Sequence, residues 1–215
     1  MPQSEIDAEP VAYLYTKEEL TNSLQCFKRE HELVEQGKGA SLGSPLTLKC
    51  IMVGINLCML AFSLWEWGFD VTMSALTNWA LVIETLHMIT SIKCGLDSEA
   101  DKKWLVFHHI SFEIMFPLNL LVVSVYWTLL RDEVVLTCPT LTTWMHTTIV
   151  HILPMLFNFI SFAITDVVAK PSHGQILLPI GAIYGYTNYK ATIRQGNPVY
   201  SFLPWTDYKS ALIIA

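Results

Sequence analysis

Charge is scarce in this sequence. Only 15% of its 215 residues are Asp, Glu, Lys or Arg, and the mean hydropathy is +0.40. A soluble domain distributes charge over its whole surface, whereas these charges are grouped between long apolar runs. The sequence also lacks a basic patch, which excludes a nucleic-acid-binding surface. We therefore expect lipid, rather than water, to surround most of the chain.

Cysteine patterns and common ligand-binding motifs are missing as well. The five cysteines are scattered and form no Cys-x-x-Cys pair, so the sequence predicts neither a disulfide framework nor a thiolate metal site. It contains no Gly-rich phosphate loop and no His-Glu-x-x-His motif. The first residues, MPQSEIDAEP, resemble neither a secretory signal nor a transit peptide.

What the sequence does contain falls into three parts. Residues 1–45 form a polar head with eight acidic residues, residues 46–203 are predominantly apolar, and residues 204–215 form a C-terminal stub. Within the head, Thr16 and Glu19 have the spacing of a capping box and predict the start of an amphipathic helix. Because this helix is acidic, we expect it to lie on a protein partner rather than on anionic lipid.

The apolar part predicts an all-α fold, an integral membrane bundle of about five transmembrane helices with the amphipathic helix outside the membrane. Each long stretch suits a hydrocarbon core of about 30 Å, and most Trp residues lie near the predicted ends. The last stretch is short and contains a proline and two glycines. The predicted spans are 46–67, 71–92, 104–130, 144–168 and 175–189.

The loops predict an orientation. The head and the loops on its side of the bundle carry nine Lys and Arg, against four on the opposite side. By the positive-inside rule, the N-terminus is expected on the cytoplasmic or matrix side. The organelle stays open between the endoplasmic reticulum, the plasma membrane and the mitochondrial inner membrane.

Polar side chains inside apolar spans are the candidate functional residues, because burying them in lipid is costly. The predicted second, third and fourth spans all contain such residues. They are Thr77, Asn78, Glu84, His87, His108, His109, Glu113, His146, Thr147, Thr148, His151 and Asn158.

Depth in the membrane brings Thr77 and His146 together. Both lie near the start of spans that run in the same direction, within roughly 10 Å of one membrane face at ~1.5 Å per residue. A hydroxyl and an imidazole at matching depth can act as nucleophile and base. The alternative is structural, with the Thr77 hydroxyl bonded to its own helix backbone and His146 to another side chain.

The remaining candidates allow other interpretations. His87 and His108 share the other membrane face and could hold a haem, with His151 as a further ligand, but the two repeated pairs of a di-haem bundle are missing. Glu84 and Glu113 lie at intermediate depth and could share a proton or form a packed polar network. We expect bound lipid, and neither a haem nor a metal ion.

Four segments in order resemble the androgen-induced-gene family of multispan membrane proteins, whose characterised members hydrolyse fatty acid esters of hydroxy fatty acids. The resemblance covers about residues 46–203, and the HTT segment with its following LP is the most specific part. The segments are ALTNWALVIETLHM, FEIMFPLNLLVVSVYW, WMHTTIVHILPM and GNPVYSFL.

The resemblance implies a threonine nucleophile at Thr77 and a histidine base at His146. If this pair hydrolyses an ester, we expect Asn78 or Thr147 to steady the oxyanion. Glu84, His87, Glu113 and His151 would line the substrate site or form a polar network. Family members usually have six spans, whereas this chain ends at KSALIIA, where a sixth would begin. We expect a protein partner in that place.

Two functions remain open from the sequence. The first is a membrane-embedded lipid-ester hydrolase, or a hydrolase-like protein that has lost this activity. The second is a non-catalytic accessory subunit of a multi-subunit membrane complex, for example a mitochondrial respiratory or ATP synthase assembly. Both require membrane lipids as partners, and neither involves nucleic acid.

Overall fold

The computed structural model describes residues 44–96, 102–138, 140–164 and 171–206, and the regular structure of these residues is entirely helical. A helix occupies each of the five stretches predicted as spans, which confirms the all-α class. The amphipathic helix predicted in the head and most of the C-terminal stub lie outside the described residues. The elements are α2 (Pro45–Ser74), α3 (Leu76–Leu96), α4 (Lys102–Val125), the π-helical segment η2 (Tyr126–Leu130), α5 (Arg131–Thr137), α6 (Leu141–Ile164), the 3-10 segment η3 (Pro171–Ile176) and α7 (Leu177–Gln195).

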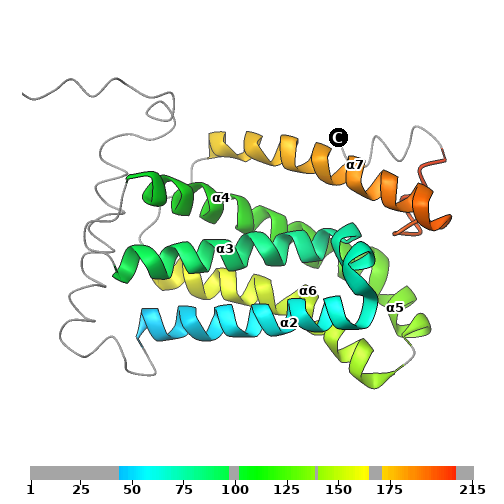
Figure 1. The fold of residues 1–215 in the computed structure, drawn as a ribbon, viewed down its shortest axis with the longest axis horizontal. Coiled ribbons are helices and arrows are strands. Elements are labelled where there is room, and N and C mark those ends of the chain that lie inside the picture. The colour runs from blue at the N-terminus through cyan, green and yellow to red at the C-terminus, as the bar shows by residue number, and fades with distance from the viewer. Residues whose placement is uncertain (1–43, 97–101, 139, 165–170, 207–215) are drawn as a thin grey trace, which may run out of the picture.

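Helix α3 lies at the centre of the bundle (Figure 1). It packs along α2 on one side and α4 on the other, while α6 contacts all three of these helices. The segment η3 contacts α4, and α7 contacts α2. The segment that joins α2 to α3 lies at the same end of the bundle as the start of α6 (Figure 1).

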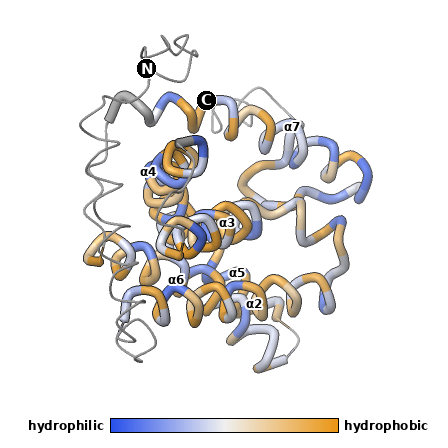
Figure 2. Tube along the Cα trace, turned by 60° about the vertical axis from the view of Figure 1, so that its left-hand side comes forward, coloured by the Kyte–Doolittle hydropathy of each residue, from blue (hydrophilic) through white to orange (hydrophobic). Residues whose placement is uncertain are grey.

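Three helical stretches are long and apolar enough to cross a membrane: Pro45–Ser74, Lys103–Thr137 and Leu141–Ile164. Their outward faces carry large exposed apolar side chains, and most of α2 and α6 is hydrophobic (Figure 2). Helix α3 carries more buried polar side chains, which its neighbours α2, α4 and α6 cover. The polar residues buried along α3 are Thr77, Asn78, Glu84, Thr85, His87, Thr90 and Ser91.

Local sequence explains where the helices begin, break and end. Ser44 caps α2 by accepting a hydrogen bond from the Thr47 N–H, and Pro45 occupies the first turn. Gly68 interrupts α2 with φ 73° and ψ 171°, a backbone conformation that is available almost only to glycine. Gly196 ends α7 in the left-handed conformation typical of helix C-termini.

Candidate functional site

Thr77 is the second residue of α3 and is 7% exposed. The tight connection from α2 holds it in place. The Asn78 side chain donates to the Thr72 carbonyl at 2.9 Å, and the Thr72 hydroxyl donates to the Ser63 carbonyl at 3.0 Å. These bonds tie the first turn of α3 to the end of α2, so the Thr77 hydroxyl has a fixed position.

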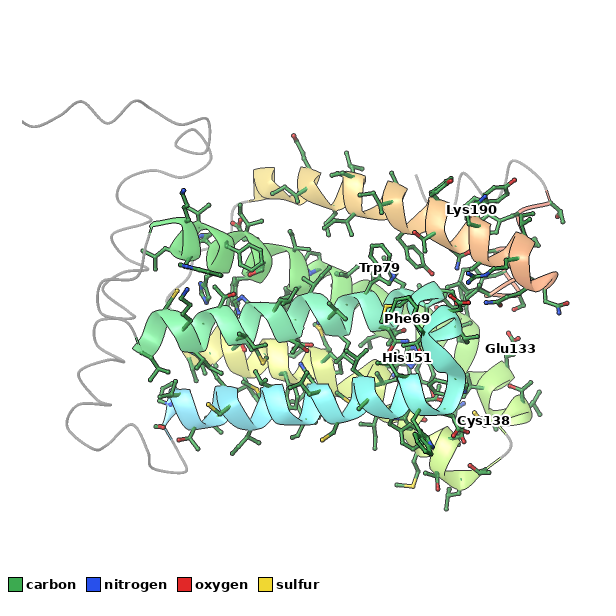
Figure 3. All side chains as sticks on the ribbon, in the orientation of Figure 1. Phe69, Trp79, Glu133, Cys138, His151 and Lys190 are labelled. Atoms are coloured by element: carbon green, nitrogen blue, oxygen red, sulfur yellow. The ribbon has the colours of Figure 1, made fainter. Side chains whose placement is uncertain are left out.

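The partner of Thr77 is His151, in the third turn of α6. Thr77 Oγ1 and His151 Nε2 are 2.9 Å apart. In the view of Figure 3, His151 of α6 lies between α2 and α3. A hydroxyl and an imidazole from two helices 74 residues apart in sequence are thus in direct hydrogen-bond contact.

The surroundings of His151 determine its tautomer. His151 Nδ1 lies against the Thr147 carbonyl, one turn earlier in α6, and a carbonyl can only accept a hydrogen bond. The proton of the neutral ring is therefore on Nδ1, and the lone pair of Nε2 faces Thr77. Thr77 donates its hydroxyl proton to this lone pair, which is the arrangement a nucleophile and its general base require.

An aromatic ring fixes the plane of His151. Tyr126 stacks on it with centroids 4.2 Å apart and an interplanar angle of 18°, and the Tyr126 hydroxyl is 3.0 Å from that of Thr148. Tyr126 begins the π-helical segment after α4. Such segments contain wider turns and occur frequently at functional sites. Here the wider turn begins at the residue that stacks on His151.

Two cavities meet at this pair. The first has a volume of about 290 Å³ and is enclosed by apolar side chains of α3, α4 and α7 and of the chain after α7. The second, of about 330 Å³, has a more polar lining that includes Ser63, Thr72, Asn78, Glu133 and Gln195. The residues that line both cavities are Thr77, Leu130, His151 and Tyr200.

His146 occupies a different position from the one predicted. Its Nε2 is 3.0 Å from the Ser63 hydroxyl on α2, and its ring packs against Phe62 and Trp67, with centroids 4.3 Å and 5.5 Å away. The sequence paired Thr77 with His146, whereas the hydrogen bond of Thr77 goes to His151. Helix α6 therefore takes part in two hydroxyl–imidazole pairs, Thr77–His151 and Ser63–His146.

The two candidates for oxyanion stabilisation have structural partners. The Asn78 amide holds the Thr72 carbonyl, and the Thr147 hydroxyl donates to the Thr143 carbonyl of its own helix at 2.8 Å. Both residues nevertheless line the polar cavity. The N-terminus of α3 offers a further source of positive potential beside Thr77, since the helix dipole points its positive end there.

The other predicted polar residues lie away from both cavities. Glu84 accepts a hydrogen bond from Asn119, and His109 and Glu113 are 4.0 Å apart. His87 Nδ1 is 3.1 Å from the Ser111 hydroxyl, and its ring lies 4.6 Å from that of His108. Two axial haem ligands require iron between them, whereas these two rings are in direct contact. Within the described residues, no three His, Cys, Asp or Glu side chains are grouped as for a metal ion.

Sequence reasoning missed three residues: Tyr126 and Tyr200 of the site, and Ser63, which lines the polar cavity beside it. Tyr200 accepts the Leu76 N–H at 3.0 Å and so holds the first residue of α3. It belongs to the GNPVYSFL segment, whose significance came only from the resemblance. Ser63 and Tyr126 gave no signal, because serine and tyrosine are ordinary residues in an apolar helix.

Comparison of this chain with protein-family profiles, with curated proteins and with solved structures finds no match. The functional assignment therefore depends on the geometry of the site.

Proposed function

We propose that this protein is an integral membrane hydrolase of lipid esters, with Thr77 as the nucleophile and His151 as the general base. The observation that carries the proposal is the position of this hydrogen-bonded pair where an apolar and a more polar cavity meet. An acyl chain would occupy the first cavity, and water would reach the ester through the second. Such a substrate is mostly hydrocarbon, whereas its ester group must react with water.

The reaction would proceed in two steps. Thr77 Oγ1 attacks the ester carbonyl while His151 Nε2 takes its proton, and the same proton then passes to the leaving alkoxide. This gives a free alcohol and an acyl-threonine. In the second step, water from the polar cavity loses a proton to His151 and attacks the acyl carbonyl. The products are the fatty acid and the free Thr77 hydroxyl.

Aromatic side chains support a reaction near one membrane face. Trp65 on α2, Trp127 in η2 and Trp144 on α6 are all exposed and lie toward the end of the bundle that holds Thr77. Trp residues are enriched at the level of lipid headgroups. Charged residues lie at the same end, including the Arg194–Asp70 ion pair at 3.2 Å. A lipid ester would thus enter from one leaflet.

The same features support the wider topology. We propose that α3 and α7 cross the membrane together with the three strongly apolar stretches, since α3 is enclosed by α2, α4 and α6. This arrangement would have five spans. The excess of Lys and Arg on one side supports an orientation with the N-terminus on the cytoplasmic or matrix side. The resemblance to the androgen-induced-gene family agrees with this proposal in fold, in activity and in the use of Thr77.

The test uses the full chain purified in mild detergent. We expect hydrolysis of a long-chain 4-nitrophenyl ester and labelling by a fluorophosphonate probe, both lost in Thr77→Ala. Ser63→Ala is the matched control, because it removes the hydroxyl of the other pair, and it should keep turnover. Full turnover in Thr77→Ala would refute the proposal. No turnover by the wild type, together with migration in a large complex at fixed stoichiometry, would instead favour the accessory subunit.

A further inference from the structure

A buried polar layer lies in the middle of the bundle, away from Thr77 and His151. It consists of one carboxyl and three amide side chains, each at most 1% exposed. None of the four lines either of the two cavities. Each comes from a different helix: Asn56 from α2, Glu84 from α3, Asn119 from α4 and Asn158 from α6.

Apolar clusters place Asn56 and Glu84 at the same level. Asn56 lies four residues after Met52 and three before Met59 on α2. Glu84 lies three residues after Leu81 and four before Met88 on α3. At these spacings each side chain shares the face of its helix that points toward the other helices. Leu153 of α6 packs against both clusters and covers the layer between them. The clusters are Met52, Met88 and Phe157 on one side and Met59, Leu81 and Val150 on the other.

Hydrogen bonds join the two remaining members to this level. Asn119 Nδ2 donates to Glu84 Oε2 at 3.4 Å. Asn158 Nδ2 donates to the Met115 carbonyl at 3.2 Å, and Met115 lies one turn before Asn119 on α4. All four helices therefore contribute to one polar region in the apolar interior.

Several oxygen atoms in this region have no partner. Among the described residues, Glu84 Oε1, Asn158 Oδ1 and both polar atoms of the Asn56 amide lack a hydrogen bond. Buried polar atoms are almost always satisfied, because leaving them bare is costly. Asn158 already uses its N–H donor on Met115, so its free atom is the oxygen. The unsatisfied atoms thus include three oxygens from three helices.

We propose that this layer binds a dehydrated Na⁺ ion. Carboxylate and amide oxygens are the ligands that hard cations prefer. One positive charge neutralises the single carboxylate, whereas a divalent ion would leave a net charge in a low-dielectric interior. Among the described residues Glu84 forms no ion pair with a cationic side chain that would neutralise it instead. The small number of protein oxygens fits Na⁺ better than K⁺, which takes more ligands.

Pro154 frees a backbone carbonyl close to the same region. Proline has no N–H, so the Val150 carbonyl loses its helical hydrogen bond. Pro154 is buried, and Val150 belongs to one of the two clusters that bound the layer. Carbonyls freed in this way coordinate Na⁺ in membrane proteins with interrupted helices.

The test compares thermal unfolding of the full chain in NaCl and in choline chloride at equal ionic strength and constant pH. Constant pH keeps proton uptake and release by other groups out of the comparison. At about ten times Kd, Na⁺ should raise Tm by about 3–6 °C. The shift should vanish in Glu84→Gln and persist in Glu113→Gln, the matched buried carboxyl. Equal Tm values of the wild type in the two salts would overturn the proposal.

A second measurement needs no variant. Dicyclohexylcarbodiimide modifies protonated carboxyl groups in apolar surroundings, and mass spectrometry locates the modified residue. Bound Na⁺ keeps Glu84 ionised and enclosed, so NaCl should slow its modification at least several-fold relative to choline chloride. A Tm shift without any protection of Glu84 would show that Na⁺ binds elsewhere and would overturn the assignment. Both measurements are independent of ester hydrolysis, so the hydrolase proposal could fail while this one holds.

Discussion

Helix α6 takes part in two hydroxyl–imidazole pairs of nearly equal length. Thr77 Oγ1 is 2.9 Å from His151 Nε2, and Ser63 Oγ is 3.0 Å from His146 Nε2. Both histidines belong to α6, five residues apart. By interatomic distance alone, either pair could act as a nucleophile with its base.

The two pairs differ in what surrounds them. Thr77 and His151 line both cavities, whereas Ser63 lines only the polar one. His151 is held in one tautomer by the Thr147 carbonyl and in one plane by Tyr126. His146 lies between the aromatic rings of Phe62 and Trp67 on α2.

The comparison teaches that a reactive pair is defined by the space it faces. A lipid ester needs an apolar volume for its chain and access to water, and both must converge on the nucleophile. Only Thr77–His151 meets this condition, while Ser63–His146 joins α2 to α6. We therefore propose a catalytic role for Thr77–His151 and a packing role for Ser63–His146.

The largest expected effect comes from exchanging the base. His151→Gln keeps a polar side chain but removes the proton acceptor, so kcat for a long-chain ester should fall by about 10²–10⁴. His146→Gln should change kcat no more than a few-fold. Steady-state hydrolysis by the two purified variants measures this. The opposite result would return the role of base to His146, as the family resemblance implies.

The sequence predicted much of the architecture. Apolar length located the long helices of the bundle, because a membrane span requires a long uninterrupted apolar run. The short helix α5 (Arg131–Thr137) lies beyond the predicted third span, which ended at residue 130. The sequence placed Thr77 six residues into a span starting at residue 71, whereas it is the second residue of α3, because α2 extends to Ser74. The five spans themselves stay a prediction, since in the described part of the chain three helical stretches are long and apolar enough to cross a membrane.

The predicted depth in the membrane does not distinguish His146 from His151 as the partner of Thr77. Five residues separate them by about 7.5 Å along α6 but turn the side chain by about 140° around it. The rotation of α6 against α3 decides which ring meets Thr77, and this rotation depends on packing with α2 and α4. The apolar cavity was equally beyond prediction, because α7 and the segment around Tyr200 close it from far along the chain.

The next largest effect concerns Gly68, which breaks α2 between the two hydroxyls of the comparison. With φ 73° and ψ 171°, an alanine there is strained, and Gly68→Ala should lower the free energy of unfolding by about 1–3 kcal/mol. Gly54→Ala is the control, because Gly54 has regular helical geometry and its added Cβ meets no atom within 4 Å. Thermal unfolding in detergent measures both. Equal stability of the two variants would mean that the backbone conformation at residue 68 does not require glycine.

A smaller effect tests the apolar cavity. Gly181 lines it, and a Cβ added there meets no atom within 4 Å, so Gly181→Leu would occupy the volume proposed for the acyl chain. Loss of space for about two methylenes should lower kcat/KM for long-chain esters about tenfold. Acetyl esters should react as before. The neighbouring Ala182→Leu, on the exposed side of α7, is the control. A similar loss for both chain lengths would contradict the cavity assignment.

The smallest effect concerns the support of Thr77 by Tyr200. Tyr200→Phe removes the acceptor of the Leu76 N–H and should cost about 1 kcal/mol of stability, with a few-fold loss of kcat. Tyr186→Phe, on the exposed face of α7, should change neither.

The pH dependence of stability identifies this hydroxyl. Burial raises the pKa of Tyr200 above its ordinary value of about 10. The unfolded chain therefore loses this proton first as pH rises, so the contribution is complete below about pH 10 and is lost above it. Denaturant unfolding at increasing pH should show a weaker alkaline decline in Tyr200→Phe than in the wild type. An identical decline would mean that the hydroxyl is not buried against α3, and the first turn that holds Thr77 would need another support.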